Sequence, residues 1–427
     1  MSALWETASP LVAGVCPDRP PMRWFVEVAW GKGAARHDRF CAKDIGDMRL
    51  LFFKRNFEWP IRAGATVHSG NLMRALVSRG HEVQLWTEKP VGDDALHWLG
   101  GVEVKHVVAV SDTVARLGWW ANRFSDFWGN DRSMLFGLQK AVQDERPDVV
   151  IFVGPDTLPA ASLLPSTPTV WYSADDPVLH QLSLGKGWRE LRAAFRMALY
   201  ELSLHRVVDA TWVVSEQDRR WSKMLRGRCV AWLPNGVDTQ YFTPQGTPQV
   251  AKTCVFWGNL AFRPNEDAVR YWLDDIWPGV LAVEPDARFW ICGCNPSNLL
   301  RARIAGVRGV EFFEDLPDLR PKVCEAEIAV FPLISGAGVK NKVLEAAAMR
   351  KPIVCTPRCR FGLAGKSLPL AVCRTAADWR DHLTRLWNNP NDRVALATLA
   401  RNWVQEEHQW SNSAAIAERS LMSVLRP

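Results

Sequence analysis

Long apolar runs are missing from this chain of 427 residues. No run reaches the ~18 apolar residues that a membrane-spanning helix needs. The longest candidate, Val149 to Tyr172, is interrupted by Asp156 and by four prolines. The opening residues, MSALWETASPLVAGVC, also lack the basic start and the long apolar core of a secretory signal. We therefore expect a cytoplasmic chain without a membrane span.

Paired cysteine motifs are missing as well. The ten cysteines include no C-x-x-C spacing. The closest pairs, Cys292 with Cys294 and Cys355 with Cys359, fall beside expected strands. This distribution favours buried, reduced thiols over zinc ligands or disulfides, which again indicates a cytoplasmic chain. We expect no metal site and no required cofactor.

Strong charge of one sign is also absent. The formal net charge is +6, and the basic residues are spread along the chain rather than gathered in a Lys/Arg stripe. Together with the lack of a nucleic-acid motif, this excludes nucleic acid as an expected partner. An anionic membrane surface remains an expected partner, because each cation near such a surface contributes about 1 kcal/mol.

Two series of alternating strands and helices are present instead. In the first, a buried strand from Met48 to Phe53 precedes helical apolar spacing over His68 to Ser78 and a further strand over Gly80 to Trp86. This βαβ opening predicts a parallel, doubly wound sheet. Further strands of this series are expected at 102–110, 149–153, 169–173 and 210–215.

The second series begins at Thr253, and the chain is long enough for two domains. Its strands are expected at 288–292, 310–313, 328–332 and 353–355, and its helices at 266–281 and 318–325. We divide the chain into residues 48–242, a linker at 243–252 rich in Pro, Gln and Thr, residues 253–400, and residues 401–427. Residues 1–47 show no sustained period, which favours a start-site artefact or a dispensable extension over a functional arm.

A glycine-bearing turn joins a strand to a helix in the second series. The strand pattern from Ile328 to Leu333 is followed by Gly336, Ala337 and Gly338, and then by an alanine-rich helix from about Asn341 to Met349. Glycine lets backbone N–H groups approach a phosphate, and a helix N-terminus favours an anion. Lys340 and Lys342 add positive charge there, and Glu345 lies one turn beyond Lys342. The pattern also fits an ordinary turn with a solvated Lys–Glu pair.

The same run resembles the donor-site segment of the family 4 glycosyltransferases, which reads roughly P-L-x-x-G-x-G-x-[KR]-x-K-x-L-E-A-x-A-x-G-x-P-[IV]-V. The matching positions are Pro332, Leu333, Gly336, Gly338, Lys340, Lys342, Leu344, Glu345, Ala346, Ala348, Pro352, Ile353 and Val354. The resemblance implies a GT-B architecture, with two Rossmann-like domains facing a cleft. It also implies a nucleotide-sugar donor, retention of the anomeric configuration and no obligate divalent metal.

The resemblance assigns roles residue by residue. Lys342 is expected on the donor diphosphate and Glu345 on the ribose, with Arg263 as a further basic residue and Gly64 closing from the first domain. The run Pro234 to Asp238 is similar to the family's domain junction, and the final segment, 401–427, to the helix that returns to the first domain. The full donor set is Gly64, Gly258, Gly336, Ala337, Gly338, Val339, Lys340, Lys342 and Glu345. Ala337 departs from the acidic residue that many members carry there, and Arg350-Lys351 replaces a glycine.

The acceptor side of the first domain is less defined. Asp175 and Asp176 follow the strand 169–173, where many family members place a histidine-rich turn, so either is a candidate for acceptor binding or for accepting a proton. His68, Trp119 and Trp120 are further acceptor candidates. The aromatic and basic stretch 116–132 and the run 188–200 fit either core-facing helices or contact with a membrane and a lipid-linked sugar.

We therefore expect a retaining glycosyltransferase that moves a sugar from a nucleotide-sugar to a glycan or lipid-linked acceptor, in surface or extracellular polysaccharide assembly. Two alternatives stay open. A sugar-nucleotide epimerase shares the two-domain shape and acts without an acceptor. A catalytically silent sugar-nucleotide binder would serve as a scaffold, which the Ala337 departure and the missing histidine turn favour.

Overall fold

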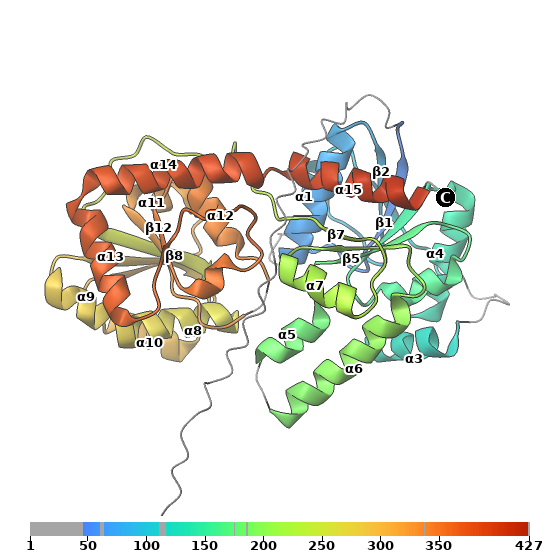
Figure 1. Cartoon of the computed structure of the whole chain (residues 1–427), viewed down its shortest axis with the longest axis horizontal. Coiled ribbons are helices and arrows are strands. Elements are labelled where there is room, and N and C mark those ends of the chain that lie inside the picture. Colours follow the sequence, from blue (N-terminus) through green and yellow to red (C-terminus); the bar gives the residue numbers. More distant parts are fainter. Residues whose placement is uncertain are drawn as a thin grey trace, which may run out of the picture. The chain divides into compact units, whose positions relative to one another are not determined.

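Two parallel sheets organise the part of the chain that this computed structural model describes (Figure 1). The structure describes residues 46–425 except 60–63, 111–116, 175, 185–186 and 337, and it leaves out the side chains of residues 120, 180, 183, 184 and 204. The extension 1–47 lies outside the described residues apart from its last two positions. Residues Asp47–Pro427 form one compact unit.

The first sheet has seven parallel strands in the order β3-β2-β1-β4-β5-β6-β7. Its central strands β4 and β5 are buried at every position because helices cover both faces of the sheet, and β4 is apolar throughout. Figure 1 shows α1 and α15 on one side and α3 and α6 on the other. The strands are β1 (Arg49–Phe53), β2 (Glu82–Thr87), β3 (Glu103–His106), β4 (Val149–Val153), β5 (Thr169–Ser173), β6 (Ala210–Val213) and β7 (Val230–Trp232).

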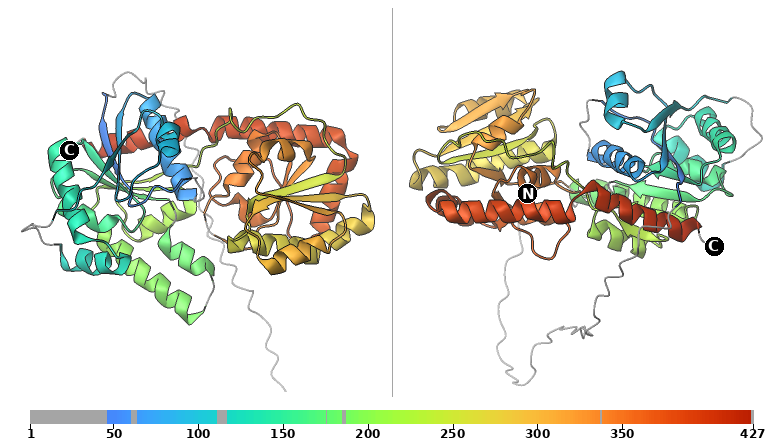
Figure 2. Two further views of the ribbon diagram at one scale, coloured as in Figure 1. Left: turned by 180° about the vertical axis from the view of Figure 1, so that it is seen from behind. Right: turned by 90° about the horizontal axis from the view of Figure 1, so that it is seen from above.

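The helices of this part confirm the expected βαβ opening. The first of them, α1, begins at Gly64, four residues before the expected start. This helix spans Gly64–Ser78. The others are α2 (Asp93–Leu99), α3 (Trp119–Trp128), α4 (Arg132–Glu145), the 3₁₀ helix η1 (Leu158–Leu163), α5 (Pro177–Leu184), α6 (Trp188–Leu204) and α7 (Glu216–Met224). Helices α5 and α6 pack against each other as an antiparallel pair (Figure 2).

The second sheet has six parallel strands in the order β10-β9-β8-β11-β12-β13. Figure 1 shows α11, α12 and α14 on one side of it and α8, α9 and α10 on the other, which is the doubly wound arrangement expected from the sequence. The strands are β8 (Thr253–Asn259), β9 (Arg288–Cys294), β10 (Val310–Glu314), β11 (Ile328–Phe331), β12 (Ile353–Cys355) and β13 (Ala371–Val372). The helices are α8 (Arg263–Tyr271), α9 (Trp277–Val283), α10 (Asn298–Ala305), α11 (Arg320–Glu325), α12 (Asn341–Ala348), the 3₁₀ helix η3 (Pro357–Arg360), α13 (Ala376–Asn388), α14 (Pro390–Glu407) and α15 (Trp410–Leu425).

Several element boundaries differ from the expectation for local reasons. The helix expected over 266–281 contains a π turn, η2 (Trp272–Ile276), between α8 and α9. Pro278 offers no N–H to the Asp274 carbonyl, and its ring would collide with that carbonyl in a regular helix. Strand β3 is shorter than expected because it is an edge strand paired only with β2. Helix α11 starts at Arg320, where the Asp318 carboxylate accepts the backbone N–H.

The last two helices belong to different parts of the fold. Helix α14 packs on α12, beside the second sheet, whereas α15 packs on α1, beside the first sheet (Figure 2). The segment that returns to the first sheet thus begins at Trp410 rather than at Arg401. The chain crosses between the sheets twice, at residues 233–253 and at 407–410.

Candidate active site

The carboxyl ends of the strands of the second sheet carry the loops that form the candidate site. These loops join β8 to α8, β11 to α12 and β12 to η3. In an open parallel sheet, ligands bind outside the carboxyl ends of the strands. The glycine-bearing turn singled out in the sequence lies in the middle loop of the three, between Phe331 and Asn341.

The turn before α12 depends on its glycines. Gly336 and Gly338 have φ values of 88° and 74°, which side chains other than glycine rarely adopt. A Cβ on Gly336 would also lie 2.9 Å from the Pro264 ring of the neighbouring loop. The Gly336 carbonyl accepts hydrogen bonds from Lys340 Nζ at 3.2 Å and from Arg358 Nη1 at 3.3 Å. Two cations therefore flank the turn, while Ala337 lies outside the described residues.

Lys342 points from the first turn of α12 toward the loop after β8. Its Nζ donates to Asn265 Oδ1 at 2.6 Å and lies 4.6 Å from the centre of the Phe256 ring. The orientation of the Asn265 amide is fixed because its Nδ2 donates to the Asn259 carbonyl at 2.8 Å. A Cβ on Gly258 would lie 2.9 Å from the Lys342 ammonium, so the glycine leaves room for the lysine in the position that it adopts.

Burial changes the proton affinity of this lysine. Desolvation is the largest effect and lowers the pKa of Lys342 from 10.5 to about 8, against the attraction of Glu345, which raises it. An anion beside the ammonium would offset that desolvation and hold the charged form. The site thus offers a cation whose charge depends on what binds next to it.

Glu345 is held by an indole. Its Oε2 accepts from Trp257 Nε1 at 2.8 Å, and Trp257 is buried at the end of β8. Burial raises the pKa of Glu345, while the Trp257 hydrogen bond and Lys342 act in the opposite direction. The hydrogen bond from Trp257 leaves Glu345 Oε1 to accept a hydrogen bond from a ligand hydroxyl, one helical turn from Lys342.

Two helices of the separate sheets begin next to each other. Gly64 starts α1 and Asn341 starts α12, and a Cβ on Gly64 would lie 3.9 Å from Asn341 Nδ2. The N-terminal end of each helix carries unpaired N–H groups and partial positive charge. The structure thus places the start of α1 beside the start of α12. The resemblance assigned both regions to binding of the donor diphosphate.

A cavity of about 380 Å³ adjoins the glycine turn. Gly336, Gly338 and Arg358 line it from the second sheet's loops, and Leu179, Leu182 and Asp218 line it from α5 and α7. Gly362 lies where the two walls of the cavity come close together. A Cβ at this position would lie 2.5 Å from Val339 Cγ2 and 3.3 Å from Ser215 Cβ. The cationic Arg358 thus lies on one wall of the cavity and the acidic Asp218 on the other.

Carboxyl groups gather behind the α5 and α7 wall. Asp176 caps α5, because its Oδ1 accepts from the backbone N–H groups of Val178 and Leu179 at 3.0 and 2.9 Å. Burial, followed by the nearby carboxylates of Asp176 and Asp218, raises the pKa of Glu201 well above its ordinary value. Asp175 lies outside the described residues. Within the described residues, no cluster of three His, Cys, Asp or Glu side chains is arranged to hold a metal ion.

Three other predicted site residues lie away from this cavity wall. Arg263 begins α8 with an exposed side chain, and its Nε is 3.8 Å from Asp267 Oδ2. His68 is only 1% exposed, packs between the Tyr172 and Trp410 rings, and faces the Leu233 carbonyl at 3.3 Å. Burial lowers the pKa of His68 to about 3. Trp119 is 66% exposed at the start of α3, and the Trp120 side chain lies outside the described atoms.

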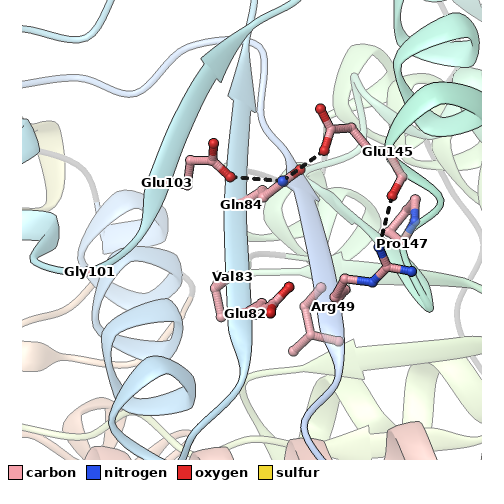
Figure 3. Close-up of a pocket in the computed structure, with 9 residues that line it drawn as sticks. Arg49, Glu82, Val83, Gln84, Gly101, Glu103, Glu145 and Pro147 are labelled. Carbon is pink, nitrogen blue, oxygen red and sulfur yellow. Dashed lines mark hydrogen bonds between the residues drawn. The ribbon is translucent and has the colours of Figure 1, made fainter.

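A second cavity, drawn in Figure 3, is of a different kind. It lies where β1, β2 and β3 begin, at the amino ends of the strands rather than at the carboxyl ends. Its polar groups pair with one another: Gln84 Nε2 donates to Glu103 at 2.8 Å and to Glu145 at 3.1 Å. This cavity does not have the position of a nucleotide site in an open parallel sheet.

The two halves of the chain match two family models. The model described as Glycosyltransferase Family 4 matches residues 62–241, and the model described as Glycosyl transferases group 1 matches residues 251–389. Together the matches cover most of the chain, and the second includes the whole glycine turn and α12. The chain belongs to the family 4 glycosyltransferases.

Solved structures agree with the GT-B architecture of this glycosyltransferase. HepE from Anabaena, in complex with UDP and glucose, has a TM-score of 0.63 and 11% identity over 88% of this chain and 100% of HepE. Sucrose-phosphate synthase from Thermosynechococcus elongatus has a TM-score of 0.64 and 12% identity over 87% of this chain and 97% of its own. WaaG, a glycosyltransferase involved in lipopolysaccharide biosynthesis, has a TM-score of 0.56 and 15% identity over 87% of this chain and 99% of WaaG. At such identities the likeness shows the fold alone, and comparison with curated protein sequences finds no match.

Sequence reasoning missed four residues that shape the site of this glycosyltransferase. Asn265 and Trp257 orient Lys342 and Glu345, Arg358 flanks the glycine turn, and Asn341 contacts the first sheet's side. Trp257 lies at the end of β8 and Asn265 at the start of α8, close in sequence to Gly258 and Arg263, which the resemblance singled out. Arg358 gives no local signal, because its role follows from β12 lying next to β11 in the sheet.

Proposed function

We propose that this family 4 glycosyltransferase is a retaining enzyme that transfers a sugar from a nucleotide-sugar to a glycan or lipid-linked acceptor. The observation that carries the proposal is the cluster of Lys342, Asn265 and Glu345 at the start of α12, next to the glycine turn. This cluster offers one cation, one fixed hydrogen-bond acceptor and backbone donors within one helical turn. A diphosphate followed by a ribose presents the complementary groups in the same order.

The chemistry follows from charge that develops on the leaving group. As the bond between the sugar C1 and the nucleotide oxygen breaks, negative charge grows on the diphosphate. Lys342, the amides from Gly336 to Val339, and Lys340 would stabilise that charge without reorganising. Arg358 of η3, which bonds the Gly336 carbonyl, and Arg263 at the start of α8 are proposed as further cations. Glu345 would accept hydrogen bonds from the ribose hydroxyls, and the start of α1 at Gly64 would approach the phosphates from the other side.

The acceptor side is proposed on the α5 and α7 wall of the cavity. Asp218 lines that wall, with Asp176 and Glu201 behind it, so the wall suits a hydroxyl-rich acceptor. His68 and Trp119 are less suited to this role, because His68 is enclosed by aromatic rings and Trp119 lies on α3. HepE binds UDP and glucose in its solved complex, and WaaG acts in lipopolysaccharide biosynthesis. These relatives support a nucleotide-sugar donor and a role in surface or extracellular polysaccharide assembly.

A panel of nucleotide-sugars tests the proposal. Each donor is incubated with the full-length protein and a candidate acceptor, and release of the nucleotide and formation of a glycoside are measured. We expect one donor to support transfer, and proton NMR of the product to show the donor's anomeric configuration. Activity should persist in EDTA if the reaction needs no divalent metal. Isomerised donor without transfer would indicate an epimerase, and binding without turnover would indicate a scaffold.

The Lys342→Ala variant tests the site itself. We expect it to lower turnover roughly 100- to 1,000-fold, as does the loss of one preorganised donor to a developing anion. The matched control is Lys366→Ala, which removes an exposed lysine from the same part of the chain. Equal activity of the two variants, with both folded, would show that Lys342 is not on the leaving group.

We also propose a cytoplasmic location with peripheral contact to the inner face of a membrane. None of the described helices is long and apolar enough to cross a bilayer. A lipid-linked acceptor would therefore have to be met at the surface of the membrane.

A further inference from the structure

Helix α6 (Trp188–Leu204) is apolar on two opposite faces. Ala194, Met197 and Tyr200 are buried, and Ala194 and Met197 pack with Val178 of α5. The opposite face carries Trp188, Leu191, Phe195 and Leu199, all exposed to solvent. Trp188 is 78% exposed and Phe195 is 66% exposed. Besides its core-facing side, the helix therefore presents a continuous apolar stripe to solvent, at spacings of three and four residues.

A row of arginines runs beside this stripe. Arg189, Arg192 and Arg196 each follow an apolar residue of the stripe, and all three are exposed. Of the two acidic residues of α6, Glu201 is fully buried and Glu190 is partly covered, so the exposed charge of the helix is mainly positive. The outer side of α6 thus combines an apolar stripe with a cationic one.

The neighbouring helix α3 extends the same surface. The Arg196 guanidinium lies 4.9 Å from the centre of the Phe127 ring of α3, and Phe127 is itself exposed. At the other end of α3, Arg123 lies 6.0 Å from the centre of the exposed Trp119 ring. Figure 1 shows α3 beside α6. Trp128, by contrast, packs against the core with Tyr200 and does not belong to this surface.

We propose that this surface, called the α6 face and made of Trp188, Arg189, Leu191, Arg192, Phe195, Arg196 and Leu199 with Trp119 and Phe127, docks the protein onto an anionic phospholipid bilayer. Apolar side chains flanked by arginines suit the boundary between headgroups and acyl chains, where tryptophan rings are also favoured. Anionic headgroups complement the arginine row, whereas a second copy of the chain would bring the row against itself. This proposal specifies which surface makes the proposed peripheral contact with the membrane, and it does not depend on the roles proposed for the catalytic residues.

The α6 face is connected to the candidate active site through α5. Helices α5 and α6 pack against each other, and Leu182 of α5 is exposed near the end of the pair while it also lines the 380 Å³ cavity. A bilayer contacting the α6 face would place lipid close to one wall of that cavity. This step rests on the proposed function, since it assigns the cavity to the acceptor.

Co-sedimentation with vesicles tests the α6 face in the full-length protein. Vesicles of phosphatidylglycerol with phosphatidylcholine are compared with vesicles of phosphatidylcholine alone. We expect binding to the anionic vesicles to fall roughly tenfold or more in the triple variant Trp188→Ser, Leu191→Ser and Phe195→Ser. We expect a loss of roughly a hundredfold in Arg189→Gln, Arg192→Gln and Arg196→Gln, with little change on neutral vesicles. These side chains are exposed, so both variants should keep the parent's melting temperature.

The control variant replaces three exposed apolar residues of α10 and α14, Leu299→Ser, Val394→Ser and Leu399→Ser. It should bind vesicles like the parent. Affinity for a nucleoside diphosphate is measured on the same preparations and should be equal in all of them, which separates this inference from the proposed function. Parental vesicle binding by either α6 variant would overturn the inference. So would conversion of a parental dimer to a monomer by the apolar variant without any change in vesicle binding, which would assign the surface to a protein interface.

Discussion

The side-chain amide of Asn235 donates a hydrogen bond to Asn341 Oδ1 at 2.7 Å, across 106 residues of chain. Asn235 lies in the segment that leaves the first sheet, and Asn341 is the first residue of α12. The same segment is fixed on its other side by His408, whose Nδ1 bonds the Asn235 carbonyl at 2.5 Å. One crossing of the chain between the sheets is thereby tied both to the second crossing and to the helix that carries Lys342 and Glu345.

Removal of this bond should affect both stability and donor binding. In Asn341→Leu the buried Asn235 amide loses its partner, and we expect the free energy of unfolding to fall by about 1 to 3 kcal/mol. Donor affinity should fall as well, because α12 loses a contact that places its first turn. Urea unfolding and titration with a nucleoside diphosphate measure the two effects. Asn298→Leu, at the exposed first residue of the equally short α10, is the matched control. Parental donor affinity in Asn341→Leu would mean that the bond does not help to place α12.

Donor binding should depend on pH through Lys342. Its pKa of about 8 means that the ammonium is charged below this pH and loses its proton above it. The affinity for a nucleoside diphosphate should therefore decrease as the pH rises from about 7 to about 9, and binding near pH 8 should take up protons. Isothermal titration in buffers of different ionisation enthalpy measures this uptake.

The Lys342→Arg variant separates this lysine from other titrating groups. Arginine keeps its charge throughout the range, so the decrease in affinity above pH 8 and the proton uptake should both disappear. Weaker binding at every pH is also expected, since the guanidinium is larger than the space left by Gly258. A decrease in affinity that survives unchanged in Lys342→Arg would assign the pH dependence to another group.

The bond from Trp257 to Glu345 should matter for the donor more than for the fold. Trp257→Phe keeps an aromatic ring against Phe331 but removes the N–H that holds the carboxylate. We expect donor affinity to fall about tenfold, the effect of losing one hydrogen bond to a charged group. Trp290→Phe is the control, because Trp290 makes the same kind of bond to Glu311 on β10. Equal donor affinities in the two variants would argue against a role for Glu345 on the ribose.

The sequence was most informative where structure is local. The helix 341–349 and the strands 149–153 and 169–173 were predicted within one residue, because apolar runs and glycines fix them without distant contacts. The π turn before Pro278 was not predicted. It depends on how one turn of backbone fits its surroundings, which composition and period do not describe.

The candidate site shows the same division. Lys342 and Glu345 follow from one short run, so the sequence placed them together correctly on one helix. The partners that orient them, Asn265 of α8 and Trp257 of β8, come about 80 residues earlier in the chain, and the pairing of β11 with β8 brings them to α12. For α6, the period of apolar residues indicates a helix but does not indicate which face packs on the core. Ala194, Met197 and Tyr200 fill that role, so the other apolar face stays exposed.

Helix α15 should stabilise the first sheet through a buried ion pair. Glu418 of α15 is buried and accepts two bonds from the Arg79 guanidinium, at 2.5 and 2.7 Å. His81 Nε2 lies 3.0 Å from Glu418 Oε1 and acts as a donor, because its Nδ1 accepts from the Met48 backbone at 3.2 Å. We expect Glu418→Ala to lower the free energy of unfolding by about 3 kcal/mol, the lower end for a broken buried ion pair, since Arg79 keeps contact with water.

The effect of Glu418→Ala should disappear in acid. Burial acts to raise the pKa of Glu418, but the bonds from Arg79 and His81 outweigh it and hold the pKa below the ordinary 4.5. A depressed pKa means that the carboxylate stabilises the fold above pH 4.5 and that this contribution is lost as the pH falls through the folded-state pKa. Parent and variant should therefore differ in urea unfolding at neutral pH and converge below pH 4.5. Glu314→Ala is the matched control, because Glu314 accepts two bonds from Arg301 at 2.6 and 2.5 Å on the surface, where solvent weakens the pair. If Glu314→Ala is as destabilising as Glu418→Ala at neutral pH, the buried pair of Glu418 and Arg79 contributes no more than an ordinary surface pair.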